Sequence, residues 1–226
     1  MRFRAGLSVV TAVAISMYSC SEKGGKNISE GEIHYSIDYS GKMGSFKDIM
    51  PHTLIVSFKH DKILFDISAP IGNSGILNLS NPEKGIFDTY ISLLTLRYYY
   101  AAKPGEMPPG FEEMRGIDIR ETSRTTKICG FDCKNAEVTF PFDRERVYQV
   151  WYTDDIKVKD PNIGNPFSKI DGVLMSFFFI MGDAEMHFTA EAVYKKEIPD
   201  KAFERKEKYQ RISREEISRF IDKLIR

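Results

Sequence analysis

One stretch of the sequence, VLMSFFFIMGDAEMHFTAEAVY, decides the fold; it runs from Val173 to Tyr194. Its second half alternates apolar and polar residues, as a half-buried antiparallel strand does. Its first half is apolar at almost every position, which indicates a central strand covered on both faces. Gly182 and Asp183, between the two halves, are typical of a tight turn. The stretch therefore predicts a β-hairpin in the interior of an antiparallel sheet.

Alternation of apolar and polar residues recurs along most of the chain, as expected of half-buried strands. The alternating segments lie at residues 33–39, 54–58, 63–67, 117–119, 138–142 and 150–152. Residues 89–102, with several leucines and three successive tyrosines, fit a strand or a buried helix equally well. The pattern as a whole predicts a mostly β, antiparallel fold.

The period changes near the end of the chain. Apolar residues there lie on one helical stripe: Ile217, Phe220, Ile221, Leu224 and Ile225. Ser213 and Glu216 form a capping box at the start of this segment. Because an isolated helix of about a dozen residues is marginal in water, we expect a C-terminal amphipathic helix that buries Phe220 and Leu224 against the sheet.

The first residues are typical of an export signal. Arg2 and Arg4 precede an apolar run from Ala5 to Met17. This run is too short to cross a hydrocarbon core as a helix, which takes about 20 residues. Cys20 follows almost directly and resembles the lipidated cysteine of a bacterial lipobox. We therefore expect an acylated Cys20 to hold the mature protein on a bilayer of the cell envelope.

Three segments follow from this interpretation. Residues 1–19 are predicted to be a lipoprotein signal peptide, residues 20–29 a flexible tether, and residues 30–226 a single β-rich domain. The absence of Asp directly after Cys20 favours the outer membrane, with the domain facing the periplasm.

Composition and motifs exclude several classes of function. The 32 Lys and Arg residues balance the 32 Asp and Glu residues, so the basic stripe that a nucleic-acid partner requires is not expected. The four histidines form no closely spaced metal-ligand pair, and no nucleophile–base motif is recognisable. We therefore expect a protein that is not an enzyme, with no catalytic, metal-binding or cofactor-binding residues.

Two cysteines remain in the predicted domain. Cys129 and Cys133 are separated by three residues rather than the two of a C-x-x-C redox motif. At a hairpin tip in an oxidising compartment this spacing favours a disulfide, with two free thiols as the alternative.

The segment ICGFDCKNA, from Ile128 to Ala136, is similar to a strand-turn-strand pattern of GLPGLI-type and related uncharacterised lipoproteins. Other parts of that pattern follow in the same order: Trp151 to Ile156, Asn165 to Phe167, Gly172 to Leu174, Phe203 and Tyr209. The resemblance spans about residues 31–212. Asp171 and Gly172 stand where the family has Leu-Pro-Gly.

Such domains resemble the LolA/LolB superfamily. The resemblance implies a curved antiparallel half-barrel around helix, with an apolar concave face and no catalytic residues. On that face we expect a ligand cavity lined by Phe58, Phe65, Phe140, Phe177, Phe179 and Phe188. Met107 and Phe111, on a loop rich in Pro and Gly, would form its rim.

The sequence therefore favours a membrane-anchored lipoprotein that binds an apolar or lipid-like ligand, such as an acyl chain, in a half-barrel cavity. The alternative is a non-catalytic interaction or scaffold protein of the cell envelope, with a filled core. An open cavity separates the first hypothesis from the second, which requires a closed core and an exposed apolar patch.

Replacing Cys20 by Ala should release the protein from the membrane, because the thiol that carries the acyl chains is lost. We expect the variant in the soluble fraction of lysed cells and the wild type in the membrane fraction. Ser21→Ala is the matched control and should stay with the membranes. A Cys20→Ala variant that still sediments with membranes would show that another feature anchors the chain.

Overall fold

The computed structural model describes residues 26–40, 50–69 and 74–225. The predicted signal peptide and residues 20–25 of the predicted tether, Cys20 included, lie outside the described residues. The end of the predicted tether is corrected, because Ile28 is 2% exposed in the main core and bridges to Ile156. Within the described ranges, no helix is long and apolar enough to cross a membrane.

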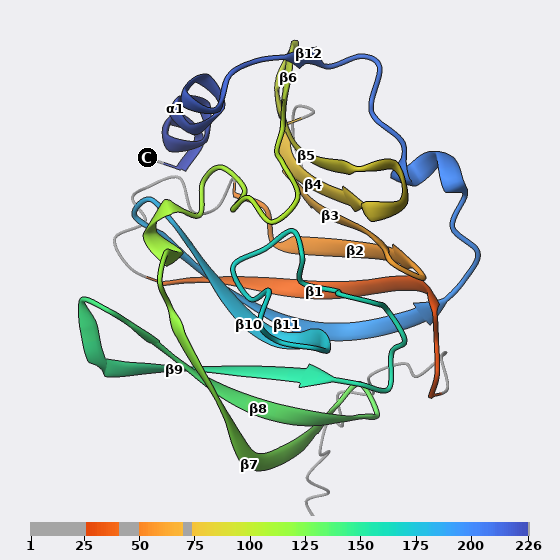
Figure 1. Cartoon of the computed structure of the whole chain (residues 1–226), viewed down its shortest axis with the longest axis vertical. Helices are drawn as coiled ribbons and strands as arrows, with labels where there is room; N and C mark the ends of the chain where they lie inside the picture. The colour runs from red at the N-terminus through yellow and green to blue at the C-terminus, as the bar shows by residue number, and fades with distance from the viewer. Residues whose placement is uncertain (1–25, 41–49, 70–73, 226) are drawn as a thin grey trace, which may run out of the picture.

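One sheet of twelve strands forms most of the described chain (Figure 1). The strands are β1 (Glu30–Ser40), β2 (Thr53–Lys59), β3 (Lys62–Ser68), β4 (Gly75–Asn81), β5 (Ile86–Leu93), β6 (Leu96–Ala101), β7 (Asp118–Ile128), β8 (Phe131–Phe140), β9 (Asp143–Thr153), β10 (Val173–Met181), β11 (Ala184–Lys195) and β12 (Gln210–Arg211). Short 3-10 helices are η2 (Pro82–Lys84), η3 (Glu112–Met114) and η4 (Asp200–Phe203), and the C-terminal helix is α1 (Arg214–Ile225).

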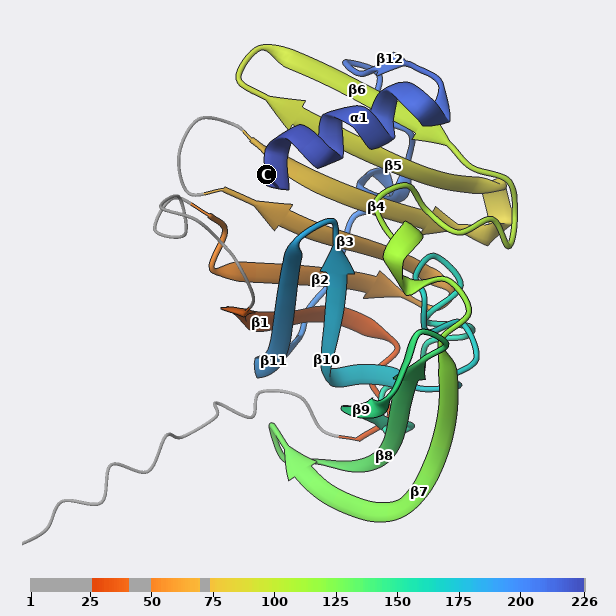
Figure 2. The ribbon, with the colours of Figure 1, turned by 90° about the vertical axis from the view of Figure 1, so that its left-hand side faces the viewer.

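The strands form two meanders that meet in the middle of the sheet. The spatial order is β12-β6-β5-β4-β3-β2-β1-β11-β10-β9-β8-β7. Strand β1 joins the two halves by pairing with β11, so Gly31 lies opposite Lys195. All pairs are antiparallel except β6 with β12. The first and last strands of this order do not pair with each other, so the curved sheet stays unclosed (Figure 2). The predicted class, a mostly β half-barrel with a C-terminal helix, is confirmed.

The predicted hairpin lies inside the sheet, as β10 and β11. Its turn is Gly182–Asp183, and Gly182 adopts a φ of 55°, which favours glycine. Across the ladder, Phe177 lies opposite Phe188 and Phe179 lies opposite Met186. The prediction made from residues 173–194 is confirmed.

Residues 89–102 form strands rather than a helix. They contribute most of β5 and β6, joined by a turn at Leu94 and Thr95. Ile91 on β5 belongs to the main core, whereas its neighbour Tyr90 belongs to a smaller cluster. Because successive side chains of a strand point to opposite faces, the two clusters lie on opposite sides of the sheet, and β5 is buried on both.

The smaller cluster lies under the segment that leads from β11 to the C-terminal helix. Phe203 of η4 is fully buried there with Leu79, Ile86 and Tyr90 of the sheet. Asn81 donates a hydrogen bond from Nδ2 to the carbonyl oxygen of Phe203 at 3.0 Å. This segment therefore covers the outer face of β4 and β5.

Helix α1 packs against β5 and β6 on the inner face (Figure 2). Ile217 and Ile221 are its buried side chains, with 0% and 1% exposure. Phe220 is only half-buried and stacks on Tyr98 of β6, with ring centroids 5.0 Å apart. The prediction that Phe220 anchors the helix in the core is therefore corrected, because the stripe that faces the sheet centres on Ile217 and Ile221. The side chain of Leu224 lies outside the described residues.

The capping box is confirmed. The backbone N–H of Ser213 donates to Oε2 of Glu216 at 2.9 Å, and the backbone N–H of Glu216 donates to Oγ of Ser213 at 3.3 Å. These bonds satisfy backbone donors that the first turn of a helix leaves without partners.

Replacing Ile217 by Ala should lower the free energy of unfolding by about 2–5 kcal/mol, because it leaves a cavity between α1 and the sheet. Urea unfolding followed by circular dichroism measures this change. Arg219→Ala, on the exposed side of the same helix, is the control and should change stability by about 0.5 kcal/mol or less. Equal effects of the two substitutions would mean that the helix does not stabilise the sheet.

Candidate functional site

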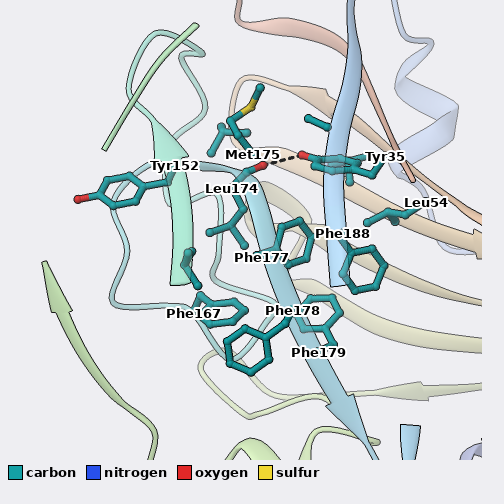
Figure 3. Packing of buried hydrophobic residues seen from close by; sticks show 14 of the residues in the cluster. Tyr35, Leu54, Tyr152, Phe167, Leu174, Met175, Phe177, Phe178, Phe179 and Phe188 are labelled. Atoms are coloured by element: carbon teal, nitrogen blue, oxygen red, sulfur yellow. Dashed lines mark hydrogen bonds between the residues drawn. The ribbon is translucent and has the colours of Figure 1, made fainter. Parts of the chain in front are cut away.

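The aromatic side chains of the central hairpin pack against one another (Figure 3). Phe177 stacks on Phe188 across the ladder with centroids 4.8 Å apart, and Phe179 meets Phe188 edge-on at 5.2 Å. Phe167, from the loop before β10, contacts Phe177, Phe178 and Phe179 at 5.6–6.3 Å. Tyr35 donates a hydrogen bond to the carbonyl oxygen of Leu174 at 2.7 Å. The centre of the half-barrel is therefore filled by side chains.

The structure separates the six phenylalanines that the sequence assigned to a cavity. Five are at most 2% exposed and belong to the packed core: Phe58, Phe140, Phe177, Phe179 and Phe188. Phe65 alone of the six is half-buried at the border of the core. Five of these residues are thus held by neighbouring side chains, because the β10–β11 hairpin brings its own aromatic groups onto the inner face.

The two predicted rim residues also differ from each other. Phe111 is 1% exposed and lies 4.7 Å from Phe179, so it belongs to the core rather than to a rim. Met107 is half-buried at the surface of the core. Its carbonyl oxygen accepts a hydrogen bond from Nη1 of Arg214 in α1 at 2.8 Å. The loop is therefore attached to the helix.

The part of the inner face that stays partly open lies on β3 and β4. Four half-buried side chains form it, and we call them the concave strip: Phe65, Ile67, Ile76 and Asn78. Across the ladder Phe65 lies opposite Asn78, and Ile67 lies opposite Ile76. On the same rows of the sheet, Val56 of β2 and Ile91 of β5 are buried. The strip is thus a half-buried band between two covered regions.

Two different elements cover the regions on either side of the strip (Figure 2). Helix α1 lies over β5 and β6, and the β10–β11 hairpin, the neighbour of β1 in the sheet, brings its aromatic side chains into the core beside β1 and β2. The loop before η3 passes between them at Gly110, which has a φ of 92°. A Cβ atom at Gly110 would lie 2.5 Å from Met181 of β10 and 3.1 Å from Ile221 of α1. Glycine is therefore required where helix, loop and hairpin meet.

Asn78 is the polar member of the concave strip. Its Oδ1 atom is buried and has no hydrogen-bond partner among the described residues. A buried acceptor without a donor costs about 1–3 kcal/mol. Water or a ligand that donates a hydrogen bond at this point would remove that cost.

The predicted disulfide is absent from the structure, in which Cys129 and Cys133 are both thiols. Cys129 lies in the turn between β7 and β8 with a φ of 51°, and its Sγ donates to the carbonyl oxygen of Ala190 at 3.2 Å. Cys133 lies within β8 opposite Thr126. The prediction of a bridge is therefore corrected, because the register places Thr126 across from Cys133. Burial raises the pKa of the Cys133 thiol to about 11.

One polar cluster brings together residue types that catalysis often uses. Glu185 accepts hydrogen bonds from Nη2 of Arg146 at 2.8 Å and from the Tyr148 hydroxyl at 3.2 Å. Nε2 of His187 lies 2.8 Å from Glu185 and 3.2 Å from Oγ of Ser40. A Ser-His-acid triad uses the two opposite ring nitrogens of the histidine, whereas here one nitrogen faces both partners. This cluster therefore lacks the geometry of a triad.

The neighbours of Glu185 also determine its protonation state. Burial alone would raise its pKa, but the hydrogen bonds from His187 and Ser40 and the charge of Arg146 outweigh burial. The pKa of Glu185 therefore lies below its ordinary value, and the carboxylate stays ionised at neutral pH. Within the described ranges, this cluster included, no three His, Cys, Asp or Glu side chains are grouped as a metal site requires.

Comparison with known proteins gives structural neighbours only. No protein-family model and no curated protein sequence matches this chain. The protein PNGF-II, solved in a C2 crystal form, is similar with a TM-score of 0.53 and 19% identity, covering 85% of this chain and 32% of that chain. In a P21 crystal form the TM-score is 0.50, with 18% identity. This likeness shows a shared fold, and our chain spans about a third of the length of PNGF-II.

Two further structures are similar at lower scores. A LolA superfamily protein from Nitrosomonas europaea has a TM-score of 0.34 and 12% identity, covering 87% of this chain and 99% of that chain. The lipoprotein LppX from Mycobacterium tuberculosis has a TM-score of 0.33 and 10% identity, covering 76% of this chain and 89% of that chain. Membership of the GLPGLI-type group stays a prediction.

Sequence reasoning identified part of the concave strip. The alternation of residues 63–67 placed Phe65 and Ile67 on one face of a strand. The sequence analysis does not identify Asn78 as part of this face. Its position two residues after Ile76 on an apolar strand would have placed it there. The sequence marks Phe167 only through the family resemblance, although its ring fills the space beside β10.

The buried thiols should react slowly in the folded protein, because the thiolate is the reactive form and burial keeps Cys133 protonated. With Cys20 replaced by Ala, a colorimetric disulfide reagent should find two thiols after unfolding without reductant. In the folded protein the rate should rise with pH toward 11. Cys133→Ala should leave one countable thiol. Finding no thiol in the unfolded, unreduced protein would restore the predicted disulfide.

Proposed function

We propose that the protein is a non-catalytic, membrane-anchored lipoprotein that binds the acyl chain of a lipid along the concave strip. The observation that carries this proposal is the contrast in burial along the sheet rows. Phe65, Ile67 and Ile76 are half-buried, whereas the side chains beside them on β2 and β5 are covered. An apolar band of this kind on the inner face of a sheet is stabilised by an apolar group that covers it.

The position of the strip suits a long, narrow ligand. Helix α1 would contact one side of the bound chain and the β10–β11 hairpin the other. Burial contributes about 25 cal/mol per Å² of apolar surface. A chain that covers a few hundred Å² of the strip therefore gains several kcal/mol before the cost of association is subtracted.

Asn78 supports a ligand with one polar group. Its unsatisfied Oδ1 atom lies on the inner face beside Phe65. A hydroxyl or amide N–H close to the acyl chain would satisfy this acceptor, and a pure hydrocarbon would not. A lipid with a hydrogen-bond donor near its chain fits the strip better than an alkane does.

The predicted acylation of Cys20 fits the same function, because an anchor and a short tether would keep the domain at the surface of a bilayer. The tether would then be residues 20–25, because Ile28 is buried in the main core and bridges to Ile156. A flexible chain of six residues spans about 12–15 Å. We place the protein at the outer membrane, facing the periplasm. The lipid-binding face would then meet its ligand at high local concentration.

A second candidate function rests on the packed core. Five of the six predicted cavity residues are buried against other side chains, as a scaffold or interaction protein requires. The same fold also occurs within the longer chain of PNGF-II. The domain would then act through its outer surface, and the concave strip would bind no lipid.

Binding of a fluorescent fatty acid to the purified, delipidated protein should be saturable, with a dissociation constant in the micromolar range. Ile76→Glu should abolish binding, because it places a charge on the apolar strip. Leu77→Glu is the matched control, since Leu77 is a half-buried neighbour on the opposite face of β4. If the wild type shows no saturable binding, or if both variants bind equally well, the results would support the interaction or scaffold function instead of lipid binding.

A further inference from the structure

A pocket of about 260 Å³ lies where the tips of two hairpins meet, apart from the concave strip. Ten residues line it: Glu113, Phe140, Phe142, Asp143, Arg146, Tyr148, Ile180, Gly182, Asp183 and Glu185. They come from the β8–β9 hairpin, the β10–β11 hairpin and η3. We propose that this pocket, the hairpin-tip pocket, is a docking site for a basic segment of another protein, with a Lys or Arg side chain in the pocket.

An exposed aromatic residue forms the edge of the hairpin-tip pocket. Phe142 is 74% exposed, although phenylalanine is among the most often buried residue types. Its ring rests on Phe140 with centroids 5.2 Å apart. Phe140 and Tyr148 are buried and form the aromatic floor. Exposed aromatic groups beside a preformed pocket are typical of the anchoring points of protein interfaces.

The charges around this aromatic floor determine the partner. Four carboxylates line the pocket against one guanidinium. Arg146 neutralises Glu185, whose two oxygens both accept from its Nη2 at 2.8 Å. Within the described chain, Glu113, Asp143 and Asp183 have no ion-pair partner. The surface is therefore complementary to a partner that brings positive charge.

One cation of the protein itself, the Arg146 guanidinium, already packs on an aromatic ring of the pocket, as we propose for the side chain of the partner. The guanidinium of Arg146 lies over the ring of Tyr148, 4.6 Å from its centroid. Aromatic faces attract cations within about 6 Å. The remaining ring, Phe142, offers a second face beside three carboxylates without cationic partners.

The pocket is large enough for one amino-acid side chain but too small for a whole lipid. Pockets for small molecules usually measure about 300–1,000 Å³, and this one lies just below that range. A Lys or Arg side chain is long and narrow and carries its charge at the end. An apolar residue next to it in the partner segment would cover Phe142. The acidic rim disfavours anionic lipid headgroups and favours a basic protein segment.

The experiment uses the purified full chain and a short fluorescent peptide of alternating Arg and Leu residues. Fluorescence anisotropy should show saturable binding that weakens as salt rises. The same peptide with Glu in place of Arg should not bind. Phe142→Ser should weaken binding about tenfold, and Asp183→Asn about two- to threefold. Both side chains are exposed, so the melting temperature should change little.

Two matched controls separate the hairpin-tip pocket from general surface effects. Val147→Ser removes another exposed apolar side chain of β9, and Glu145→Gln removes another carboxylate; neither residue lines the pocket. Both should bind the peptide as the wild type does. Equal binding of the Arg and Glu peptides, or equal affinity of Phe142→Ser and Val147→Ser, would overturn the proposal.

Gel filtration without peptide tests the remaining occupant, a second copy of this chain. We expect the same elution volume for the wild type and for Phe142→Ser. A dimer that Phe142→Ser converts to a monomer would assign the surface to self-association and would overturn the proposal. Fatty-acid binding at the concave strip is measured separately, so failure of one proposal leaves the other standing.

Discussion

The burial of β10 on both of its faces is the constraint on which the rest of the structure depends. Phe177 and Phe179 point to one face and meet Phe188 of β11, whereas Phe178 points to the other and stacks on Tyr148 at 4.1 Å. A strand that is apolar on both faces cannot lie at an edge or on an open surface. The sheet must therefore curve around β10, and Phe167 must fill the space beside it.

A single short helix explains why the inner face is covered unevenly. Twelve residues of α1 extend for about 18 Å, whereas neighbouring strands lie about 4.8 Å apart. The helix can therefore cover only a few of the twelve strands. The β10–β11 hairpin covers others, and β3 and β4 remain between the two. Phe65 and Ile76 are half-buried for this reason, although their chemistry resembles that of the core residues.

The elements with a clean local pattern were predictable from the sequence, and those that depend on distant neighbours were not. The hairpin at 173–194 and the capping box of α1 follow from short-range spacing. Residues 89–102 have no clear period, because β5 is covered by α1 on one face and by the segment around Phe203 on the other. The sequence shows which phenylalanines face the inner side of the sheet. Which of these side chains remains solvent-accessible depends on where α1 and the β10–β11 hairpin cover that side. The contact of Cys133 likewise depends on strand register.

The pairing of β1 with β11 determines the order in which this protein can fold. Gly31 and Lys195 lie opposite each other in that ladder. The two meanders can therefore pair only when residues from near both ends of the described chain are present. Each meander can form from neighbours in sequence, whereas contacts between distant residues carry a large loop-closure cost and form late. The half-barrel is thus completed only after its last long strand has emerged. The chain therefore stays incompletely folded until late in its synthesis.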